Sequence, residues 1–411
     1  MTMQSAWFVS MGLQGVIFPY LLVDRLGLGA ELVGIAQALI ALPTFILMLP
    51  GGALADRFDG RSILIVTHLI ATFPPLLLAT ILMAGGLSYE ILLAYGIAMG
   101  TLAAFSGPAR DSLLNRVVSA SDGKMTLQRA VMLSSVFMFS SQIVGMILAS
   151  QADRIGAHWV LMFQGVIILG TIWFIRQLRL PRREERDYGS GVEYHMEQMK
   201  DGLVEAFTHR QIMPTVTVAL CIGIFYVGAF NVILPIQVRD FHGGGAWRFA
   251  MISIAFFSGT IISSMILFRR GGIRRAGRAL TIAVLFGAVV QTLLSNHVPY
   301  PVLVGFVFLW GLGGGVAITM SRSIVQELAP ESHRGRLLSV FSMGFMGGAP
   351  LGSFAMGYLI QYLDAYSAVF VPASMMLLCI SLLVWRTDLW RITFPGPENA
   401  GTAENISSPS E

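Results

Sequence analysis

The stretch GGALADRFDGR, residues 51–61, decides how this sequence is organised. It carries two aspartates and two arginines within six residues, and it lies between two apolar runs, 31–55 and 61–84. Each run is long enough to cross the ~30 Å hydrocarbon core of a bilayer as a helix, which takes about 20 residues. This cluster of four charged residues therefore predicts a short turn at a membrane surface.

The composition indicates an integral membrane protein. Of the 411 residues, 55% are hydrophobic and 12% charged, with a mean hydropathy of +0.70, whereas soluble domains average about 25% charged residues. Cys221 and Cys379 both lie in apolar runs, so no disulfide framework is expected. The sequence offers no metal-ligand cluster, phosphate-binding loop or acid–base pair, which predicts no cofactor, no metal and no enzyme.

A scan for apolar segments of spanning length predicts an all-α membrane protein with twelve transmembrane helices. The expected spans are 3–24, 31–55, 61–84, 89–110, 129–150, 157–178, 211–237, 246–268, 277–296, 300–322, 336–361 and 366–386.

The distribution of basic residues predicts the orientation of these spans. With both termini inside, 23 of the 27 Lys and Arg residues fall in inside loops and only four, at Arg25, Arg154, Arg239 and Arg248, fall outside. Short cytoplasmic loops carry such an excess, so we expect both termini in the cytoplasm and the protein in the inner membrane. Because the basic residues are spread over short loops, nucleic-acid binding is not expected.

The longest polar stretch divides six spans from six. We therefore predict an N-terminal half at 1–178, a cytoplasmic linker with an amphipathic helix at 179–210, a C-terminal half at 211–391 and a disordered cytoplasmic tail at 392–411. The halves also look like an internal repeat, since SLLNRVVS (112–119) follows the fourth span and SIVQELAP (323–330) the tenth.

Polar groups inside the spans are candidates for a substrate path. Gln14, Gln37, Gln142 and Asn231 lie within apolar helices, where an amide facing lipid is costly, so each is expected to face protein or a cavity. Bonding between helices is the alternative role for each. No acid lies at mid-membrane, so any proton coupling falls to carboxylates near the span ends. The candidates are Asp24, Asp111 and Glu327.

These features together resemble the major facilitator superfamily of secondary transporters. GGALADRFDGR is similar to its loop G-x-L-A-D-R-x-G-R-R/K, with matches at Gly52, Leu54, Asp56, Arg57 and Arg61 and departures at Asp59 and Gly60. FSGPARDSLLNRVV (105–118) and QELAPESHRGRLLSVFSMGFMGGAPLG (326–352) further resemble the branch that holds the enterobactin exporter and macrolide efflux proteins. Two motifs of many members, an arginine deep in span four and a Gly-Pro pair in span five, are missing here.

The resemblance implies two pseudo-symmetric six-helix halves and a cavity lined by spans one, four, seven and ten. It adds Phe18, Tyr226 and Phe230 to the cavity candidates. Phe18 lies one helical turn from Gln14, and Phe230 lies one turn from Tyr226. It also implies a gating loop in which Asp56 meets the inner start of span eleven, near Arg334 and Arg336, while Gly52, Arg57 and Arg61 complete the loop. A solvated topogenic turn is the simpler alternative.

The expected function is efflux of an amphipathic small molecule, drug-like or siderophore-like, by alternating access across the inner membrane. The expected partners are this small molecule, the lipid bilayer and, as an open alternative, protons; the protein is expected to be a monomer. A lipid or metabolite carrier of the same fold and a non-transporting membrane scaffold or receptor remain alternatives.

Overall fold

The regular structure of the chain is entirely helical over the residues described by this computed structural model, which are 2–119, 127–177, 208–269, 273–329 and 334–394. The elements in order are α1 (Thr2–Pro19), η1 (Tyr20–Arg25), α2 (Ala30–Arg57), α3 (Gly60–Met83), α4 (Tyr89–Ser119), α5 (Leu127–Ala149), α6 (Ala152–Ile155), α7 (Ala157–Gln177), α9 (Ile212–Cys221), η2 (Ile222–Val227), η3 (Ala229–Ile233), α10 (Leu234–His242), α11 (Ala246–Arg269), α12 (Ala276–Leu293), α13 (Tyr300–Leu328), α14 (Arg334–Tyr362), α15 (Ala365–Arg386) and η4 (Leu389–Arg391).

Twelve long helical segments among the described residues follow the order of the twelve predicted spans. Two of them are composite, because α1 continues into the π-helix η1, and α9 continues through η2 and η3 into α10. Eleven, all except α5, are long and apolar enough to cross a membrane. Several side chains of α5 lie outside the described part of the structure.

Three helices extend beyond the ends of the apolar spans predicted for them. The fourth helix continues to Ser119, the seventh to His242 and the tenth to Leu328, instead of ending near 110, 237 and 322. Hydropathy marks where the bilayer ends, whereas a helix continues as long as its i→i−4 hydrogen bonds do. The predicted spans are therefore the apolar cores of longer helices.

The linker before the C-terminal half and the tail after it were both given a predicted structure. The linker helix expected before residue 207 falls among residues that the structure does not describe. The tail was expected to be disordered from residue 392, yet Ile392 is 1% exposed and Phe394 N donates to Arg274 O at 2.8 Å. Packing against α12 therefore orders residues 392–394.

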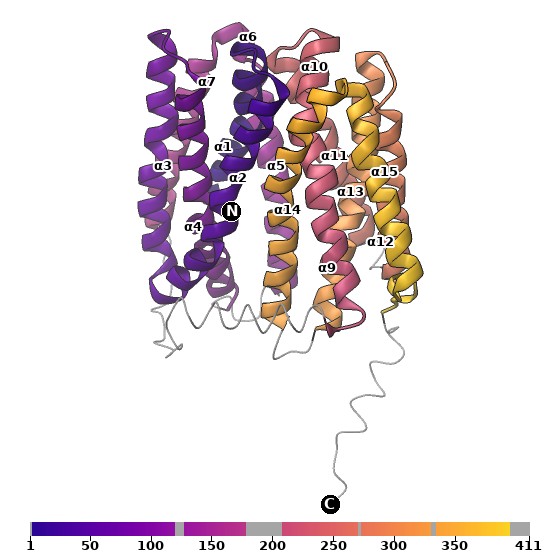
Figure 1. Cartoon of the computed structure of the whole chain (residues 1–411). Helices are drawn as coiled ribbons and strands as arrows, with labels where there is room; N and C mark the ends of the chain where they lie inside the picture. The colour runs from indigo at the N-terminus through magenta and orange to yellow at the C-terminus, as the bar shows by residue number, and fades with distance from the viewer. Residues whose placement is uncertain (1, 120–126, 178–207, 270–272, 330–333, 395–411) are drawn as a thin grey trace, which may run out of the picture.

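The helices form two groups, α1–α7 and α9–α15 (Figure 1). The groups meet where α2 runs beside α14 and where α5 runs beside α11. Gln361 of α14 donates to the Glu31 carboxylate of α2, and the rings of Phe139 and Phe257 lie 6.1 Å apart between α5 and α11.

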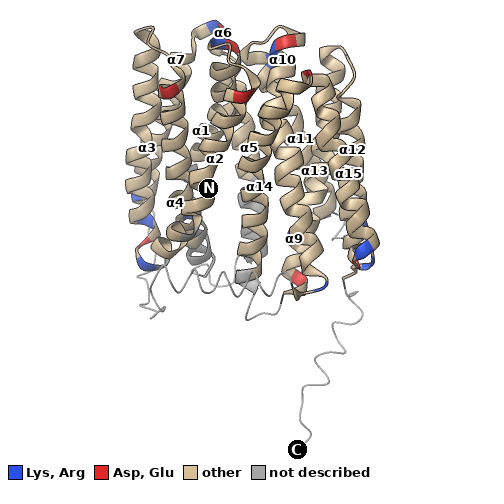
Figure 2. Cartoon of the chain, viewed as in Figure 1, with Lys and Arg blue, Asp and Glu red and all other residues tan. Residues whose placement is uncertain are grey.

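The two ends of the helix bundle carry different charges (Figure 2). We call the end with α6 and α10 the α10 end, and the end where residues 177 and 208 flank the linker the linker end. The described arginines at the α10 end are accompanied by acids, whereas arginine predominates at the linker end. This is the distribution used above to predict that the linker end faces the cytoplasm.

Candidate substrate cavity and its closure

A cavity of about 210 Å³ lies between the two halves. Its walls come from α1, α2, the composite seventh helix and α11. The lining residues are Met11, Gln14, Gly15, Phe18, Pro19, Gln37, Ile40, Phe230, Asn231, Pro235, Phe249, Ile252 and Ser253. Their side chains are apolar, aromatic, amide or hydroxyl, and none of these thirteen is charged.

Three of the predicted amides share this cavity. Gln14 and Gln37 come from the first half and Asn231 from the second, and Gln37 Nε2 donates to the backbone oxygen of Asn231 at 3.3 Å. The Oε1 atom of Gln14 is buried and has no hydrogen-bond partner among the described residues. A buried acceptor left unpaired is costly, so a ligand that donates a hydrogen bond here would stabilise the site.

An aromatic cluster supports one wall of the cavity. Phe230 lines the cavity, and its ring centroid lies 4.8 Å from that of Phe256 and 6.2 Å from that of Trp310. Such pairs contribute about 0.5–1.5 kcal/mol each beyond their buried area. The cluster therefore holds the Phe230 ring in place at the cavity wall.

Two predicted cavity residues lie elsewhere. Tyr226 is buried behind the wall, where its hydroxyl donates to Val284 O at 2.6 Å and its ring packs on Trp310. Gln142 is absent from the lining; its backbone carbonyl packs against Gly12 at the crossing of α1 and α5. Helical spacing placed these residues in spans correctly, but it could not tell which face of a helix meets the cavity.

Sequence reasoning missed the contribution of α11. Phe249, Ile252 and Ser253 line the cavity, although the resemblance pointed to spans one, four, seven and ten. Ser253 is the only polar residue of these three, and its hydroxyl donates to Phe249 O at 3.1 Å within its own helix. A serine satisfied in this way gives no indication of a cavity in the sequence.

Polar contacts between the halves close the α10 end beyond this cavity. Arg239 Nη1 donates to Leu28 O at 2.6 Å and to Val23 O at 3.4 Å. The second half also donates through Gly245 N, which binds Asp24 Oδ1 of the first half at 3.2 Å. Since Arg239 follows the lining residue Pro235 by four positions, it lies about 6 Å along the helix axis from the cavity.

The turn between α10 and α11 is built for this contact. Gly243, Gly244 and Gly245 have φ angles of +78°, +61° and +91°, which side chains other than glycine rarely adopt. A Cβ atom on Gly244 would also lie 2.0 Å from Asp24 Oδ1. Next in the chain, Trp247 N donates to Asp153 Oδ2 at 3.3 Å. Two carboxylates of the first half thus bind backbone N–H groups at the start of α11, where the helix dipole favours negative charge.

The other predicted site residues are only partly described. The side chains of Asp56, Asp111, Arg334 and Arg336 lie outside the described part of the structure. Arg57 and Glu327 are exposed near the linker end, and Arg61 donates to Arg176 O in its own half. A Cβ atom on Gly52 would meet nothing within 4 Å. The gating contact of Asp56 with the start of α14 stays a prediction.

The family follows from a match over nearly the whole chain. The family MFS_3, described as transmembrane secretion effector, matches residues 13–395. The chain belongs to this family.

Solved structures share the fold of this chain. The crystal structure of a mutant of the nucleoside transporter NupG matches with a TM-score of 0.71 and 13% identity, covering 93% of this chain and 98% of that one. A second crystal structure of NupG matches with a TM-score of 0.66 and 13% identity, covering 93% and 97%. At this identity the likeness concerns the fold alone. No curated protein matches the chain.

Family and fold together confirm the predicted all-α architecture of the major facilitator superfamily. The chain is a multi-pass membrane protein and a secondary transporter, and it is not an enzyme. Its partners therefore include a small-molecule substrate and membrane lipid.

Proposed function

We propose that this transporter exports an amphipathic small molecule without net charge, drug-like or siderophore-like in size and polarity. The observation that carries the proposal is the cavity between the halves, which is lined by amides and phenylalanines and by no charged side chain. Apolar walls with a few fixed polar groups are typical of sites for such ligands. A fixed charge on the ligand would enter this cavity without a counter-charge and at a high desolvation cost.

The residues of the cavity divide the work of binding. Phe18, Phe230 and Phe249 enclose the apolar part of the ligand, and the amides of Gln14 and Asn231 orient its polar groups from opposite halves. In the alternating-access cycle, the halves rock about this site. The arrangement described here, with the α10 end joined, is the state in which the ligand enters from the linker end.

The direction of transport rests on two further observations. The family description names secretion, and the arginines at the linker end favour a cytoplasmic position for that end. Reporter tags after Arg391 and within 186–196 should thus be accessible only from the cytoplasm in inverted and intact vesicles. A periplasmic reaction of either tag would reverse the proposed direction.

A second candidate is transport of a neutral, hydrogen-bonding metabolite of the nucleoside type. The amides of Gln37 and Asn231 in the cavity wall favour it, because a base or sugar needs such groups, and one solved structure with this fold is a nucleoside transporter. If transport is coupled to protons, we propose that the coupling uses Asp24, Asp111 or Glu327, the carboxylates near the span ends. An imposed pH gradient across proteoliposomes should drive accumulation if one of them couples.

The experiment that tests the proposal is a ligand panel on the purified protein. A ligand that binds only the folded state raises the apparent stability by about 2.7 kcal/mol at a hundredfold excess over its Kd. We expect neutral amphipathic compounds to raise the unfolding temperature and their charged analogues to have no effect. Stabilisation by nucleosides alone would select the second candidate.

Transport of the stabilising compound by proteoliposomes completes the test. We expect the labelled compound to move down an imposed gradient and to exchange across the membrane. A protein that neither binds any member of the panel nor exchanges any of them would be a scaffold or receptor.

A further inference from the structure

The linker end of the second half carries a cluster of arginines held in place by packing. The chain after α15 turns back over the start of α12, where Gly277 N donates to Ile392 O at 3.1 Å and Phe394 N donates to Arg274 O at 2.8 Å. Leu389 and Ile392 are 0% and 1% exposed. The turn between α11 and α12 and the segment beyond α15 therefore form one surface.

The close packing of the segment after α15 on α12 depends on one glycine, Gly277. A Cβ atom on Gly277 would lie 1.8 Å from Leu389 O, so only glycine lets the returning segment approach α12 so closely. We call the surface the arginine platform and define it by Arg274, Arg275, Arg278, Arg386 and Arg391.

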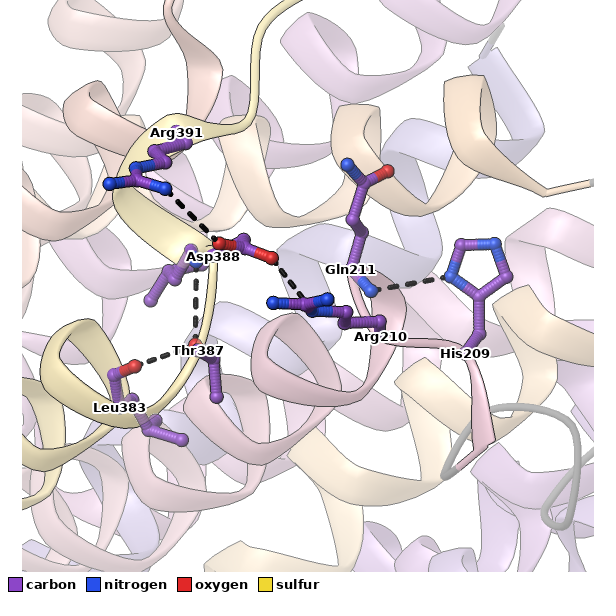
Figure 3. A network of polar contacts seen from close by, with 8 residues as sticks. His209, Arg210, Gln211, Leu383, Thr387, Asp388 and Arg391 are labelled. Atoms are coloured by element: carbon purple, nitrogen blue, oxygen red, sulfur yellow. Dashed lines mark hydrogen bonds and ion pairs between the residues drawn. The ribbon is translucent and has the colours of Figure 1, made fainter.

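One described acid belongs to this surface, and it is already paired. Asp388 Oδ2 lies 2.8 Å from Arg210 Nε, and Asp388 Oδ1 lies 3.9 Å from Arg391 Nη1 (Figure 3). Among the described residues, no carboxylate lies within ion-pair distance of Arg274, Arg275 or Arg386. Three guanidinium groups of the platform are thus without a counter-charge there.

Two tryptophans flank these arginines. The guanidinium carbon of Arg278 lies 5.4 Å from the ring centroid of Trp390, and that of Arg386 lies 4.6 Å from the ring centroid of Trp385. Trp385 is 74% exposed. Tryptophan is enriched at the level of lipid headgroups, so this level of the bilayer meets the platform.

An apolar track leads along α15 to the platform. Leu378, Leu382 and Trp385 are 62%, 50% and 74% exposed, and their spacing places them on one helix face. Arg386 follows directly at the end of that helix. An acyl chain can lie along the track while its headgroup meets the guanidinium groups.

The first half also has an exposed apolar track among its described residues, with Val166, Leu169 and Trp173 at 60%, 48% and 61% exposed before Arg176, but its described arginines are fewer. At the same end of the molecule, Arg61 donates to the carbonyl of Arg176, and Arg57 also has an interaction partner. A positive charge that only sets topology needs neither an open guanidinium nor a neighbouring tryptophan. The platform differs from the first half in that it gathers five arginines, of which Arg278 and Arg386 lie over tryptophan rings.

We propose that the arginine platform binds the phosphate of an anionic phospholipid, with one acyl chain along Leu378, Leu382 and Trp385. Guanidinium groups present paired N–H donors that fit phosphate oxygens. A lipid fits better than a soluble phosphate, because the exposed apolar track continues from the charged cluster. The lipid would rest against α12 and α15 and hold the second half at a fixed depth.

Native mass spectrometry of the protein in an uncharged detergent tests this assignment. Phosphatidylglycerol, phosphatidylcholine with the same acyl chains and inorganic phosphate are added in separate titrations. We expect a saturable phosphatidylglycerol adduct and no comparable adduct of the other two. Equal binding of both lipids, or binding of inorganic phosphate with the same affinity, would overturn the proposal.

Single substitutions localise the site. Arg275→Gln should weaken phosphatidylglycerol binding about fivefold, the typical effect of one basic residue near an anionic lipid surface. The matched control is Arg176→Gln, which removes one exposed arginine at the same end but in the other half. Monodisperse elution of both variants establishes folding. Equal losses in the two variants would mean that only overall charge matters, and the platform would be discarded.

Discussion

The charges at the α10 end join the two halves, whereas the described charges at the linker end of the second half stay on that half. At the α10 end, Arg239 and Asp24 each bind backbone groups across the seam. At the linker end, Asp388 pairs with Arg391 of the same half and with Arg210 at the end of the linker, and Arg274, Arg275 and Arg386 are exposed. Charges that bind across a seam can gate, and charges that stay on one half can anchor.

This contrast has a physical basis in what each charge meets. The carboxylate of Asp24 meets the N–H group of Gly245 and the positive end of a helix dipole, partners that are within reach only while the halves touch. The platform arginines meet partners on their own half, so rocking of the halves leaves them unchanged. Variants at the two ends should therefore differ in kind as well as in size.

The largest effect is expected from breaking the α10 seam with Arg239→Ala. A hydrogen bond from a charged donor contributes about 1.5–3 kcal/mol, so the population joined at the α10 end should fall roughly 10- to 150-fold relative to the open state. Distances between spin labels on α2 and α14 at the α10 end should lengthen.

The control for this prediction is Arg248→Ala. The guanidinium of Arg248 donates to Gly243 O and Gly244 O within its own half, so its loss should leave the label distances unchanged. If Arg239→Ala and Arg248→Ala behave alike, the contacts at the α10 end do not gate.

A similar effect in the opposite direction is expected from Asp56→Asn. If Asp56 binds the start of α14 in the other state of the cycle, its loss should cost that state about 1–3 kcal/mol, a roughly 5- to 150-fold shift toward the arrangement described here. Labels at the linker ends of α2 and α14 should report wider separation, and transport should fall with unchanged expression. Wild-type distances together with normal transport would leave GGALADRFDGR as a topogenic turn.

A smaller effect is expected at the cavity between the two ends. Gln14→Leu and Asn231→Leu each remove one hydrogen-bonding group, worth about 0.5–1.5 kcal/mol, so ligand binding should weaken roughly two- to tenfold. The matched control is Gln142→Leu, because Gln142 is an amide in the same half as Gln14 but does not line the cavity. Calorimetric titration with a stabilising compound measures the three affinities, and equal values for all three would remove the amides from the site.

The smallest effect concerns the cap of α15 at the α10 end. Asp364 Oδ1 accepts from Tyr366 N at 2.9 Å and Ser367 N at 3.1 Å, and Oδ2 accepts from Ser367 Oγ at 2.6 Å. These hydrogen bonds, that from the Ser367 side chain first, lower the pKa of Asp364. Asp364→Ala should cost about 0.5–1 kcal/mol, at the lower end for an N-cap because the site is exposed.

The pH dependence of this cap follows from the lowered pKa. The stabilisation is present above the unfolded pKa of about 3.9 and is lost as pH falls through the lower folded value. The unfolding temperatures of Asp364→Ala and wild type should thus differ at neutral pH and converge in acid. Ser367→Ala, which keeps the backbone cap, should show a smaller difference at neutral pH.

The sequence by itself determined the class of the protein, the order of its spans and the presence of a turn within residues 51–61, where α2 ends at Arg57 and α3 begins at Gly60. A segment in a bilayer must satisfy its own backbone hydrogen bonds and present apolar side chains, so hydropathy and charge mark each span without knowledge of its neighbours. The resemblance carried by GGALADRFDGR supplied the superfamily, which the family match confirmed.

Only the tertiary structure decided which polar residues share a site. Gln14, Gln37 and Asn231 line one cavity, whereas Tyr226 and Gln142 do not, although the sequence places all five inside apolar spans. It also decided that Asp24, expected as an ion-coupling candidate, contacts the glycine turn at Gly245, and that Ile392 is packed. The reason is that helical periodicity fixes which residues share a face, while the rotation and partner of that face depend on many weak contacts between helices distant in sequence.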